Sequence, residues 1–385
     1  MHLLKSARMF LSFAPRPALL LVLILPAITI TARPLVIVPV WDSSITSDPD
    51  AATITNTINM AIQFYEARFA DPISVSIEFE ETNRGLGEQG FYYYDILYSE
   101  FITSLHQDAT TTNDIYALAH LPYGLSNTVP ISLKNPVNGS ETIRVHTANL
   151  KAIGITGYTS GLPGGVDGIV SLNTSMMNLT RASIDPSQYD LLSVAEHEIN
   201  EVLGLGSGLD FLADIEPLPQ DLFRYTSAGA RTFTTNGDDA WFSLDGTNFL
   251  VQFNQIFGAD HGDWWSNPGA SFTPRVQDAF GTPGATPNMG VELIALDVQG
   301  YDLIPPPQPD IASIALTGTN LVVTGTNGLA TGLYYLLAST NLALALNQWS
   351  PVATNFMTNN GNFAFTATNA VKPQSAQQFY ILQLQ

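Results

Sequence analysis

The stretch "SVAEHEINEVLGLGS", Ser193 to Ser207, carries the strongest pattern in this chain. It predicts a helix that begins near Asp190 and ends where Gly204 and Gly206 let the backbone turn sharply. The predicted helix has a broad apolar surface, formed by Leu191, Leu192, Val194, Ala195, Ile199, Val202 and Leu203. On such a helix, residues four positions apart share a face.

Three ionisable residues of this helix suit a metal ion. His197 and Glu201 are four positions apart and can point toward one ion. Glu198 is rotated by about 100° from His197, so it can reach a water molecule on that ion. The zinc-peptidase pattern H-E-x-x-H uses two histidine ligands with a glutamate base between them, and here Glu201 replaces the second histidine.

Glu201 can take the place of the second histidine as a metal ligand, because zinc also accepts carboxylate oxygen. A bound zinc ion lowers the pKa of its water to about 7, so Glu198 could take a proton at neutral pH. One carboxylate among three ligands is tolerable, whereas two would favour harder ions or weaker catalysis.

The third ligand must come from outside the helix. Ser207 occupies the position of a third histidine in the metzincin pattern, and serine is a poor zinc ligand. His261, in "GADHGDWWSNPG", follows the motif and is flanked by Asp260 and Asp263. Ligand chemistry favours His261, which would complete a set of two histidines and one glutamate. The earlier histidines are expected to be structural or surface residues: His106, His120 and His146.

Composition limits the class of protein. The chain of 385 residues is 45% apolar and 12% charged, which is typical of a globular protein. Its net charge of −20 disfavours binding to nucleic acids or anionic membranes, which need clusters of Lys and Arg. There are no cysteines, so neither disulfides nor thiolate ligands contribute.

The N-terminus predicts export. Residues 1–32 combine basic residues with an apolar run, Ala18 to Ala32, that is short for a membrane span and ends in small residues. We expect a signal peptide cleaved near Ala32, no later membrane span, and a secreted or cell-envelope protein.

The segments before the C-terminal region include both predicted strands and predicted helices, and we expect an α+β domain over residues 33–303. Helices are predicted at residues 47–72, capped by Asp50 and closed by Pro72, at 92–109, and at 288–303, ending at Gly300. A buried first strand is predicted at 33–41, further strands at 73–81 and 167–175, and a hairpin at 240–253 with Asp245 and Gly246 at its turn.

A proline-rich linker, residues 304–310, separates a second region of different character. Short alternating runs predict a β-sandwich over residues 311–385, with strands in 314–318, 321–325, 333–339, 363–367 and 379–385. This region has no catalytic constellation, so we expect a spacer or a module for surface attachment.

Several motifs together resemble a known family. "AEHEINEVLGLGS", "PQDLFRYTSAGAR", "AWFSLDG", "GDWW" and "ELIALDVQGYDL" are similar to motifs of exported bacterial metallopeptidase-like proteins with the pattern H-E-[IL]-x-E-V-[ML]-G. The resemblance covers roughly Val36 to Leu303 and is metzincin-like in the order of its elements. The long insertion before the last ligand also resembles leishmanolysin-type peptidases.

The resemblance implies a metzincin-like domain with metal ligands at His197 and Glu201 and the general base at Glu198. It leaves the third ligand open between His261 and Asp263, since the family element "GDW" favours the aspartate. It also implies that Met289 lies beneath the metal. The strand at 167–175 would then be the edge strand that pairs with a peptide substrate.

Two functions therefore remain. The first is a secreted zinc peptidase that hydrolyses peptide bonds with a metal-bound water and Glu198 as base. The second is a catalytically inactive zincin-like protein that serves extracellular binding or adhesion. Calcium is an alternative cation at "NGDDAW", where Asp238 and Asp239 lie, although this stretch lacks an EF-hand pattern and a plain turn is expected.

Overall fold

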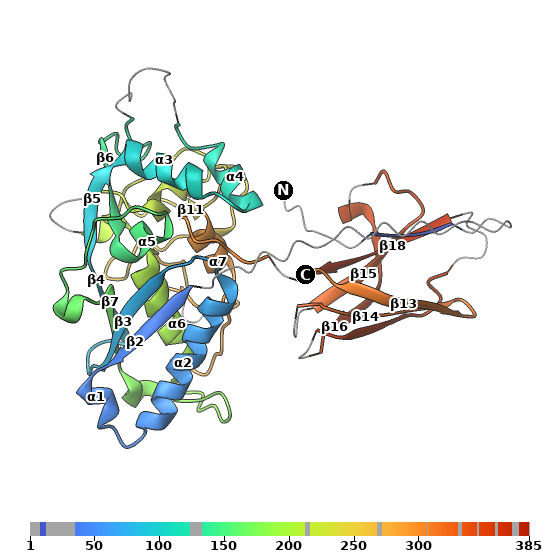
Figure 1. The fold of residues 1–385 in the computed structure, drawn as a ribbon, viewed down its shortest axis with the longest axis horizontal. Coiled ribbons are helices and arrows are strands. Elements are labelled where there is room, and N and C mark those ends of the chain that lie inside the picture. The colour runs from blue at the N-terminus through green and yellow to red at the C-terminus, as the bar shows by residue number, and fades with distance from the viewer. Residues whose placement is uncertain are drawn as a thin grey trace. The chain divides into compact units, whose positions relative to one another are not determined.

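The structure is a computed structural model, and its described residues fall into two compact units, one within Ile30–Ile304 and one that joins Pro305–Gln385 to Met1–Thr29 (Figure 1). The described residues are 8–12, 35–123, 133–211, 216–267, 272–305, 307–329, 333–344, 346–358, 361–371 and 377–384. Of the predicted signal peptide only β1 (Arg8–Ser12) is described, and it pairs antiparallel with β18 (Gln377–Leu384). The rest of that segment lies outside the described residues, and its cleavage stays a prediction.

The larger unit is an α+β fold. Its helices are α1 (Ser43–Thr46), α2 (Ala51–Arg68), α3 (Tyr98–Asp108), α4 (Thr112–Leu118), α5 (Thr147–Ala152), α6 (Leu191–Leu203) and α7 (Val291–Asp297). Its strands are β2 (Val36–Trp41), β3 (Ser74–Glu81), β4 (Gly87–Phe91), β5 (Tyr93–Leu97), β6 (Thr142–His146), β7 (Gly168–Leu172), β8 (Met177–Asn178), β9 (Tyr189–Asp190), β10 (Arg224–Tyr225), β11 (Trp241–Phe242) and β12 (Val251–Gln252). Short 3-10 turns occur at Pro163–Gly165, Thr174–Met176, Gly208–Asp210 and Pro219–Phe223.

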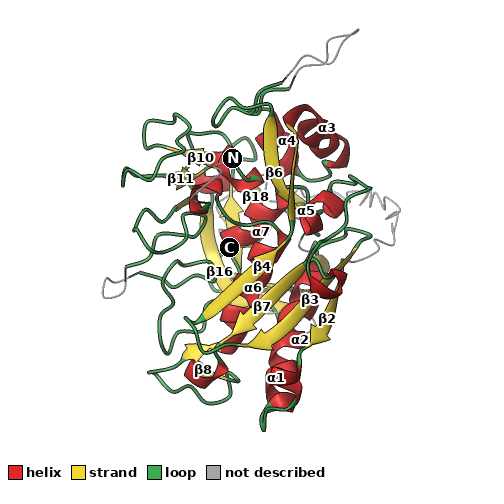
Figure 2. Cartoon of the chain, turned by 90° about the vertical axis from the view of Figure 1, so that its left-hand side faces the viewer, coloured by secondary structure: helices red, strands yellow, loops and turns green. Residues whose placement is uncertain are grey.

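The main sheet has the strand order β2-β3-β7-β4, visible side by side in Figure 2. Strands β2, β3 and β7 are parallel, and β4 runs antiparallel to β7. The strand predicted at 167–175 is therefore an interior strand, and its prediction as the substrate-pairing edge is wrong. The edges are β2 and β4, because the short turn-rich segment that forms β4 completes the sheet beside β7.

Two further sequence predictions need correction. The first strand, β2, is at an edge and is only half-buried, since Val36, Val38 and Val40 are exposed on one face. The helix predicted at 92–109 begins only at Tyr98, because the residues before it form β5 and pair with β6. The partner strand lies some 45 residues further along the chain, so periodicity within the segment could not reveal the pairing.

Helix α2 packs on α6 with its apolar face. Ile54, Ile58 and Ile62 are buried, and the Tyr65 hydroxyl donates to the carbonyl of Glu196 on α6 over 2.7 Å. Asp50 stands at the N-cap of α2 but makes no capping hydrogen bond with its side chain.

The boundaries of α6 agree with the sequence. The Asp190 side chain accepts a hydrogen bond from the Ser193 amide, and Gly204 ends the helix with a φ of 133°. A Cβ atom on Gly168 of β7 would lie 2.4 Å from a methyl group of Val202 on α6. The sheet and this helix are therefore in contact through a position that only glycine fits.

The remaining elements of this unit follow the predictions in outline. β11 pairs with β12 as an antiparallel hairpin, and the Asp245 carboxylate accepts hydrogen bonds from the amides of Thr247 and Asn248 in its turn. The closing helix α7 ends at Asp297, before Gly300, which has a φ of 107°.

The C-terminal unit consists of two antiparallel sheets around one apolar cluster, to which residues of β14, β15, β17 and β18 contribute. One sheet has the order β13-β14-β17 and the other β1-β18-β15-β16. The bounds are β13 (Asp310–Thr317), β14 (Asn320–Thr326), β15 (Leu333–Ser339), β16 (Ser350–Phe356) and β17 (Phe363–Ala367), with a 3-10 turn at Leu346–Gln348. The sequence analysis missed β16.

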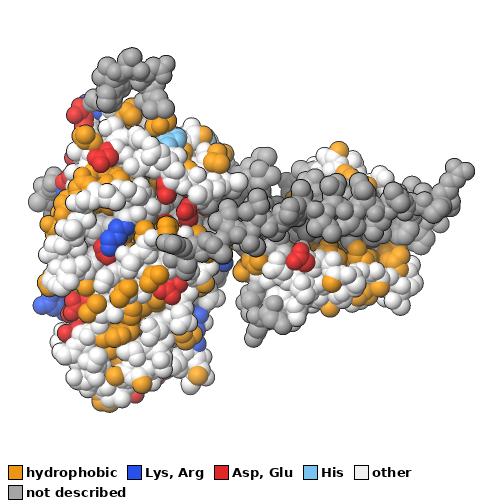
Figure 3. Space-filling view, in the orientation of Figure 1, with side chains coloured by type: hydrophobic (Ala, Val, Ile, Leu, Met, Phe, Trp, Pro, Cys, Tyr) orange, Lys and Arg blue, Asp and Glu red, His pale blue; other side chains and the backbone are white. Residues whose placement is uncertain are grey.

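Surface charge and helix length agree with the composition. On the face drawn in Figure 3, Lys and Arg side chains are few and scattered. No helix among the described residues is both long and apolar enough to cross a membrane.

Substituting Gly168 tests the contact between the sheet and α6. Gly168→Ala would force a methyl group against Val202, and we expect overpacking to cost about 1–3 kcal/mol of unfolding free energy. Gly90→Ala in β4 is the matched control, because its Cβ atom would meet Ile169 at an ordinary 3.8 Å. Thermal and urea unfolding of both variants measure the difference. Equal stability of the two variants would contradict the close packing.

Candidate metal centre

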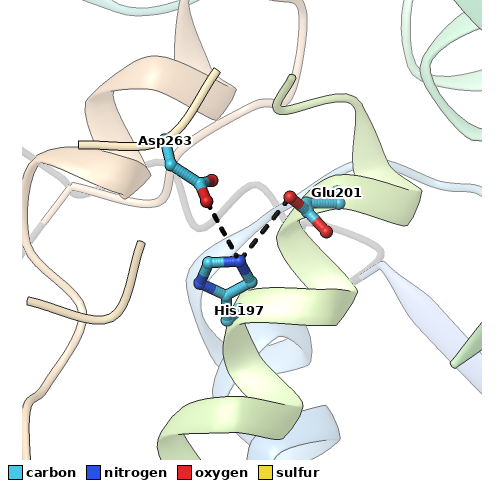
Figure 4. Close-up of side chains that lie close together, drawn as sticks. All are labelled: His197, Glu201 and Asp263. Carbon is cyan, nitrogen blue, oxygen red and sulfur yellow. Dashed lines mark ion pairs between the residues drawn. The ribbon is translucent and has the colours of Figure 1, made fainter. Parts of the chain in front are cut away.

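Three side chains from two segments meet beside α6 (Figure 4). His197 Nε2 lies 3.6 Å from Glu201 Oε1, one helical turn along α6, and 3.6 Å from Asp263 Oδ2 in a distant loop. One ligand atom from each residue lies within 4.8 Å of the others. Among the described residues this is the only such group of three, so the structure brings together the two motif ligands and one of the two predicted third ligands.

A hydrogen bond to the backbone sets the orientation of His197. Its Nδ1 donates to the carbonyl of Val276 over 2.9 Å, which leaves Nε2 facing the two carboxylates. An anchored Nδ1–H is the usual arrangement of a metal-binding histidine, because it presents the Nε2 lone pair to the ion.

The spacing of these atoms fits a tetrahedral ion. Ligand bonds of about 2.1 Å in tetrahedral geometry separate ligand atoms by about 3.4 Å, close to the two observed 3.6 Å separations. The donor set of one imidazole nitrogen and two carboxylate oxygens is also one that zinc and other divalent transition metals accept. The residues present therefore fit a metal ion on both geometry and donor chemistry.

The three side chains act on one another's pKa. Burial lowers the pKa of His197, but Asp263 and Glu201 outweigh this effect and raise it well above its ordinary value. Burial raises the pKa of Glu201 and of Asp263 to about 7 each, while His197 opposes that increase. A metal ion would take the place of the imidazolium charge, since binding releases the ligand protons.

Contact between two glycines places the Asp263 loop against α6. A Cβ atom on Gly262 would lie 2.4 Å from the Cα atom of Gly206, so the two backbones touch. The Gln220 side chain links the same segments, because it accepts from the Gly206 amide over 2.5 Å and donates to the Gly262 carbonyl over 2.9 Å. Gly206, predicted only as a helix-ending residue, therefore also admits the loop that carries Asp263.

Helix α7 fixes the other side of that loop. Glu292, in the first turn of α7, is fully buried and accepts from the Trp264 indole N–H and from the backbone N–H of Gln277, both over 3.1 Å. Trp264 is also fully buried, so the residue after Asp263 is an anchor rather than part of a loose loop.

Gln277 is a member of the site that sequence reasoning missed. Its Nε2 lies 2.8 Å from Asp263 Oδ1, 3.3 Å from His197 Nε2 and 3.4 Å from Glu201 Oε1. It therefore donates to the Asp263 oxygen that does not face His197, and its NH2 group lies beside all three residues of the group. No motif marks this amide, which lies in an irregular stretch 14 residues after Asp263.

A buried chain of hydrogen bonds orients Gln277. Asn200 Nδ2 donates to Gln277 Oε1 over 2.9 Å, and the Tyr65 hydroxyl lies 2.7 Å from Asn200 Oδ1. Met289 borders this chain, with its sulfur 3.6 Å from Asn200 Nδ2. Met289 thus packs behind the centre, against the same helix that carries the motif.

Glu198 lies beside the group and against β4. Its carboxylate is buried, and a Cβ atom on Gly87 would lie 2.2 Å from its Oε1. Oε2 has no hydrogen-bond partner among the described residues. Burial, and next the charge of Glu201, raise the pKa of Glu198 well above its ordinary value.

An open cleft gives access to these side chains. Its walls are the start of the edge strand β4, one side of α6 and the loops around Asp260 and Val276. His197, Glu198, Glu201 and Asp263 all line it. The edge strand and the ionisable residues of α6 therefore face the same space.

The structure places His261 elsewhere. Its Nδ1 donates to Asp210 over 2.7 Å, and its backbone amide donates to the same carboxylate over 2.9 Å. The Arg224 guanidinium donates to the His261 carbonyl over 2.6 Å. His261 is thus held by Asp210 and is outside the group of three.

The other predicted candidates do not join the group either. His146 is buried, and its Nδ1 donates to the Glu201 carbonyl over 3.0 Å; burial lowers its pKa to about 4. Asp238 and Asp239, the calcium candidates, are exposed and accept hydrogen bonds from the side-chain amides of Asn236 and Gln252.

No protein-family profile matches this chain, and neither a curated protein nor a solved structure matches it. The metzincin-like resemblance therefore stays a prediction based on motifs.

The choice between the two third ligands is testable by metal content. After zinc loading and gel filtration, elemental analysis should find one ion per chain for the unaltered protein and for His261→Asn. Asp263→Asn should lose the ion, because it removes a charged ligand from the group. Retention by Asp263→Asn together with loss in His261→Asn would reverse the assignment.

Proposed function

We propose that this chain is a secreted metal-dependent peptidase. The observation that carries the proposal is the convergence of His197, Glu201 and Asp263 beside Glu198 in a cleft bordered by the free edge of a sheet. The metzincin-like motifs of the sequence point to the same function. The proposal retains the predicted export signal and an attachment role for the C-terminal unit.

Zinc is the proposed cofactor, held by His197, Glu201 and Asp263. When bound, such an ion supplies Lewis acidity that polarises a carbonyl group and acidifies water. Two carboxylates in the set reduce this acidity and increase the affinity for harder ions. Metal loading should therefore be compared for zinc, cobalt and manganese.

Glu198 is the proposed general base. Its side chain lines the cleft, where it can take a proton from water as the water oxygen attacks the peptide carbonyl carbon. When the C–N bond breaks, Glu198 returns that proton to the leaving nitrogen. Its raised pKa suits a group that must hold a proton between these two steps.

The edge strand β4 is the proposed substrate platform. Among the described residues its only strand partner is β7, and its first residues line the cleft beside Glu198. An extended peptide could therefore add to the free edge of β4 through backbone hydrogen bonds. Gly87 supports this arrangement, because any side chain there would displace the Glu198 carboxylate.

The test of catalysis is Glu198→Gln. We expect this variant to lose hydrolysis of unstructured protein substrates by at least about 100-fold, while it keeps its metal content. Glu196→Gln is the matched control, since Glu196 is a buried glutamate on the same helix and is outside the cleft lining. Activity that survives in Glu198→Gln would contradict the mechanism, and inactivity of the unaltered, metal-loaded chain would contradict the proposed function.

One observation favours a second candidate, an inactive extracellular binding protein. The Gln277 Nε2 group lies 3.3 Å from His197 Nε2 and 3.4 Å from Glu201 Oε1, and because an amide NH2 group cannot ligate an ion, it occupies space that a catalytic water would need. In that case the ion would stabilise the cleft, and the cleft would bind a partner without hydrolysis.

Gln277→Leu separates the two candidates. For a peptidase, loss of the hydrogen bond to Asp263 should weaken metal binding by about 10–100-fold and lower activity with it. For a closed site, removing the amide should open the ion to water without changing partner binding. Competition with a chromogenic chelator measures the affinity, and Gln299→Leu, another fully buried glutamine, is the control. An unchanged metal affinity would mean that Gln277 does not orient Asp263.

A further inference from the structure

A loop beside the candidate metal centre presents an aromatic side chain to solvent. Phe257 is 96% exposed, whereas the next most exposed large apolar side chain among the described residues, that of Ile115, is 65% exposed. Single exposed apolar residues are common on protein surfaces, so exposure alone assigns no role to Phe257. Phe257 is set apart by its position beside the cleft and by the way in which its loop is held.

The loop that carries Phe257 is closed at its base by one of the candidate metal ligands. It runs from Asn254 to Asp263, and the backbone N–H of Asn254 donates to the carbonyl of Asp263 over 2.8 Å. Arg224 is fully buried and holds the same base, because it donates to the His261 carbonyl over 2.6 Å and to the Asn254 carbonyl over 3.4 Å. Loops whose ends are joined in this way are compact and frequently functional. Phe257 therefore belongs to a closed loop that ends at the candidate metal centre.

The side chain of Asn254 also fixes the tip of this loop. Asn254 is fully buried, and its Oδ1 accepts from the Ile256 backbone N–H over 3.0 Å. Its Nδ2 donates to the carbonyls of Ala259 and Asp260 over 3.1 Å and 3.0 Å. The backbone on both sides of Phe257 is thus tied to one buried amide. A residue held in this way loses little conformational entropy when it binds a partner.

The residues that follow Phe257 form part of the cleft wall. Gly258, Ala259 and Asp260 line the same cleft as the candidate metal centre. Adjacent Cα atoms are about 3.8 Å apart, so Phe257 stands at the rim of the cleft, one residue from its wall. The backbone turns at Gly258, which has a φ of 90°. A polypeptide that leaves the cleft on this side passes within reach of the Phe257 ring.

The charge around Phe257 favours a polypeptide over a membrane as its binding partner. Protein surfaces that bind anionic membranes combine apolar residues with Lys and Arg. The loop "NQIFGADHGD", Asn254 to Asp263, contains two aspartates and neither Lys nor Arg, and the whole chain has a net charge of −20. An anionic lipid surface would therefore repel this loop, whereas an apolar side chain of a polypeptide carries no charge to be repelled.

We propose that Phe257 determines specificity by binding an apolar side chain of the polypeptide that occupies the cleft. The inference rests on the proposed function, because that function makes the occupant a polypeptide. The edge strand β4 and the Phe257 loop both border the cleft, so one extended chain can contact them together. Aromatic rings attract one another beyond the effect of apolar burial, so a phenylalanine of the substrate is the favoured partner.

Binding without turnover tests this role. The metal-loaded, full-length Glu198→Gln variant is titrated with two fluorescently labelled, unstructured polypeptides that carry either phenylalanine or serine at the same positions. Adding Phe257→Ser should weaken binding of the phenylalanine polypeptide about tenfold and leave binding of the serine polypeptide unchanged. Phe257→Leu should retain most of the affinity, because it keeps an apolar side chain. Ile115→Ser in α4 is the matched control for loss of an exposed apolar residue, and it should change neither affinity.

Failure of either polypeptide to bind, or an unchanged affinity of the Phe257→Ser variant for the phenylalanine polypeptide, would overturn the proposal. An equal loss in Ile115→Ser would also overturn it, because the preference would then come from non-specific apolar contact. So would a loss of binding to phosphatidylcholine vesicles in Phe257→Ser with polypeptide affinity retained, which would assign the ring to a membrane. Hydrolysis of both polypeptides by the unaltered chain is measured separately. If neither is cleaved while the binding pattern holds, the peptidase function fails and the role of Phe257 stands.

Discussion

The burial of ionisable side chains on α6 is the constraint on which the larger unit depends. His197, Glu198 and Glu201 project from a helix packed against α2 and the main sheet, where an unpaired charge would cost several kcal/mol. The surrounding structure offsets that cost: the Val276 carbonyl holds the imidazole, and Asp263 supplies an opposite charge. The Asp263 loop can approach α6 only because two glycine backbones touch. The charge that Asp263 supplies to the site therefore depends on this backbone packing.

Helix α7 connects this constraint to a second one. It has seven residues, and a helix that short is not stable alone, so it must be held at both ends. At its start the Glu292 carboxylate accepts hydrogen bonds from the Trp264 indole N–H and from the backbone N–H of Gln277, beside the candidate metal centre. At its end Asp297 accepts hydrogen bonds from the side chains of Thr111 and Asn113 at the start of α4. The hydrogen bonds at both ends of α7 therefore bear on how firmly the centre is supported.

Local patterns allowed much of this to be predicted from sequence. The bounds of α6, the buried face of α2 and the pairing of His197 with Glu201 all follow from helical periodicity, which is visible within a short window. The third ligand could not be decided, because His261 and Asp263 are two residues apart in an irregular loop whose path depends on Gly206 and Gln220. Gln277 gave no signal at all, since a single amide in a loop has neither periodicity nor charge. The position of β4 at the edge of the main sheet was not predicted, because the edges of a sheet are set by strand partners distant in sequence.

The arrangement around Gln277 also bears on what the centre can do. A catalytic ion needs a position open to water, and the Gln277 amide stands close to that position. Its carbonyl oxygen accepts from Asn200, which in turn contacts Tyr65, so the amide is restrained by a chain of buried groups rather than by solvent. Gln277 can therefore move away from the three candidate ligands only if that chain rearranges. Glu198, in contrast, lines the open cleft. The cleft side of the centre therefore favours catalysis, whereas the position of the Gln277 NH2 group opposes it.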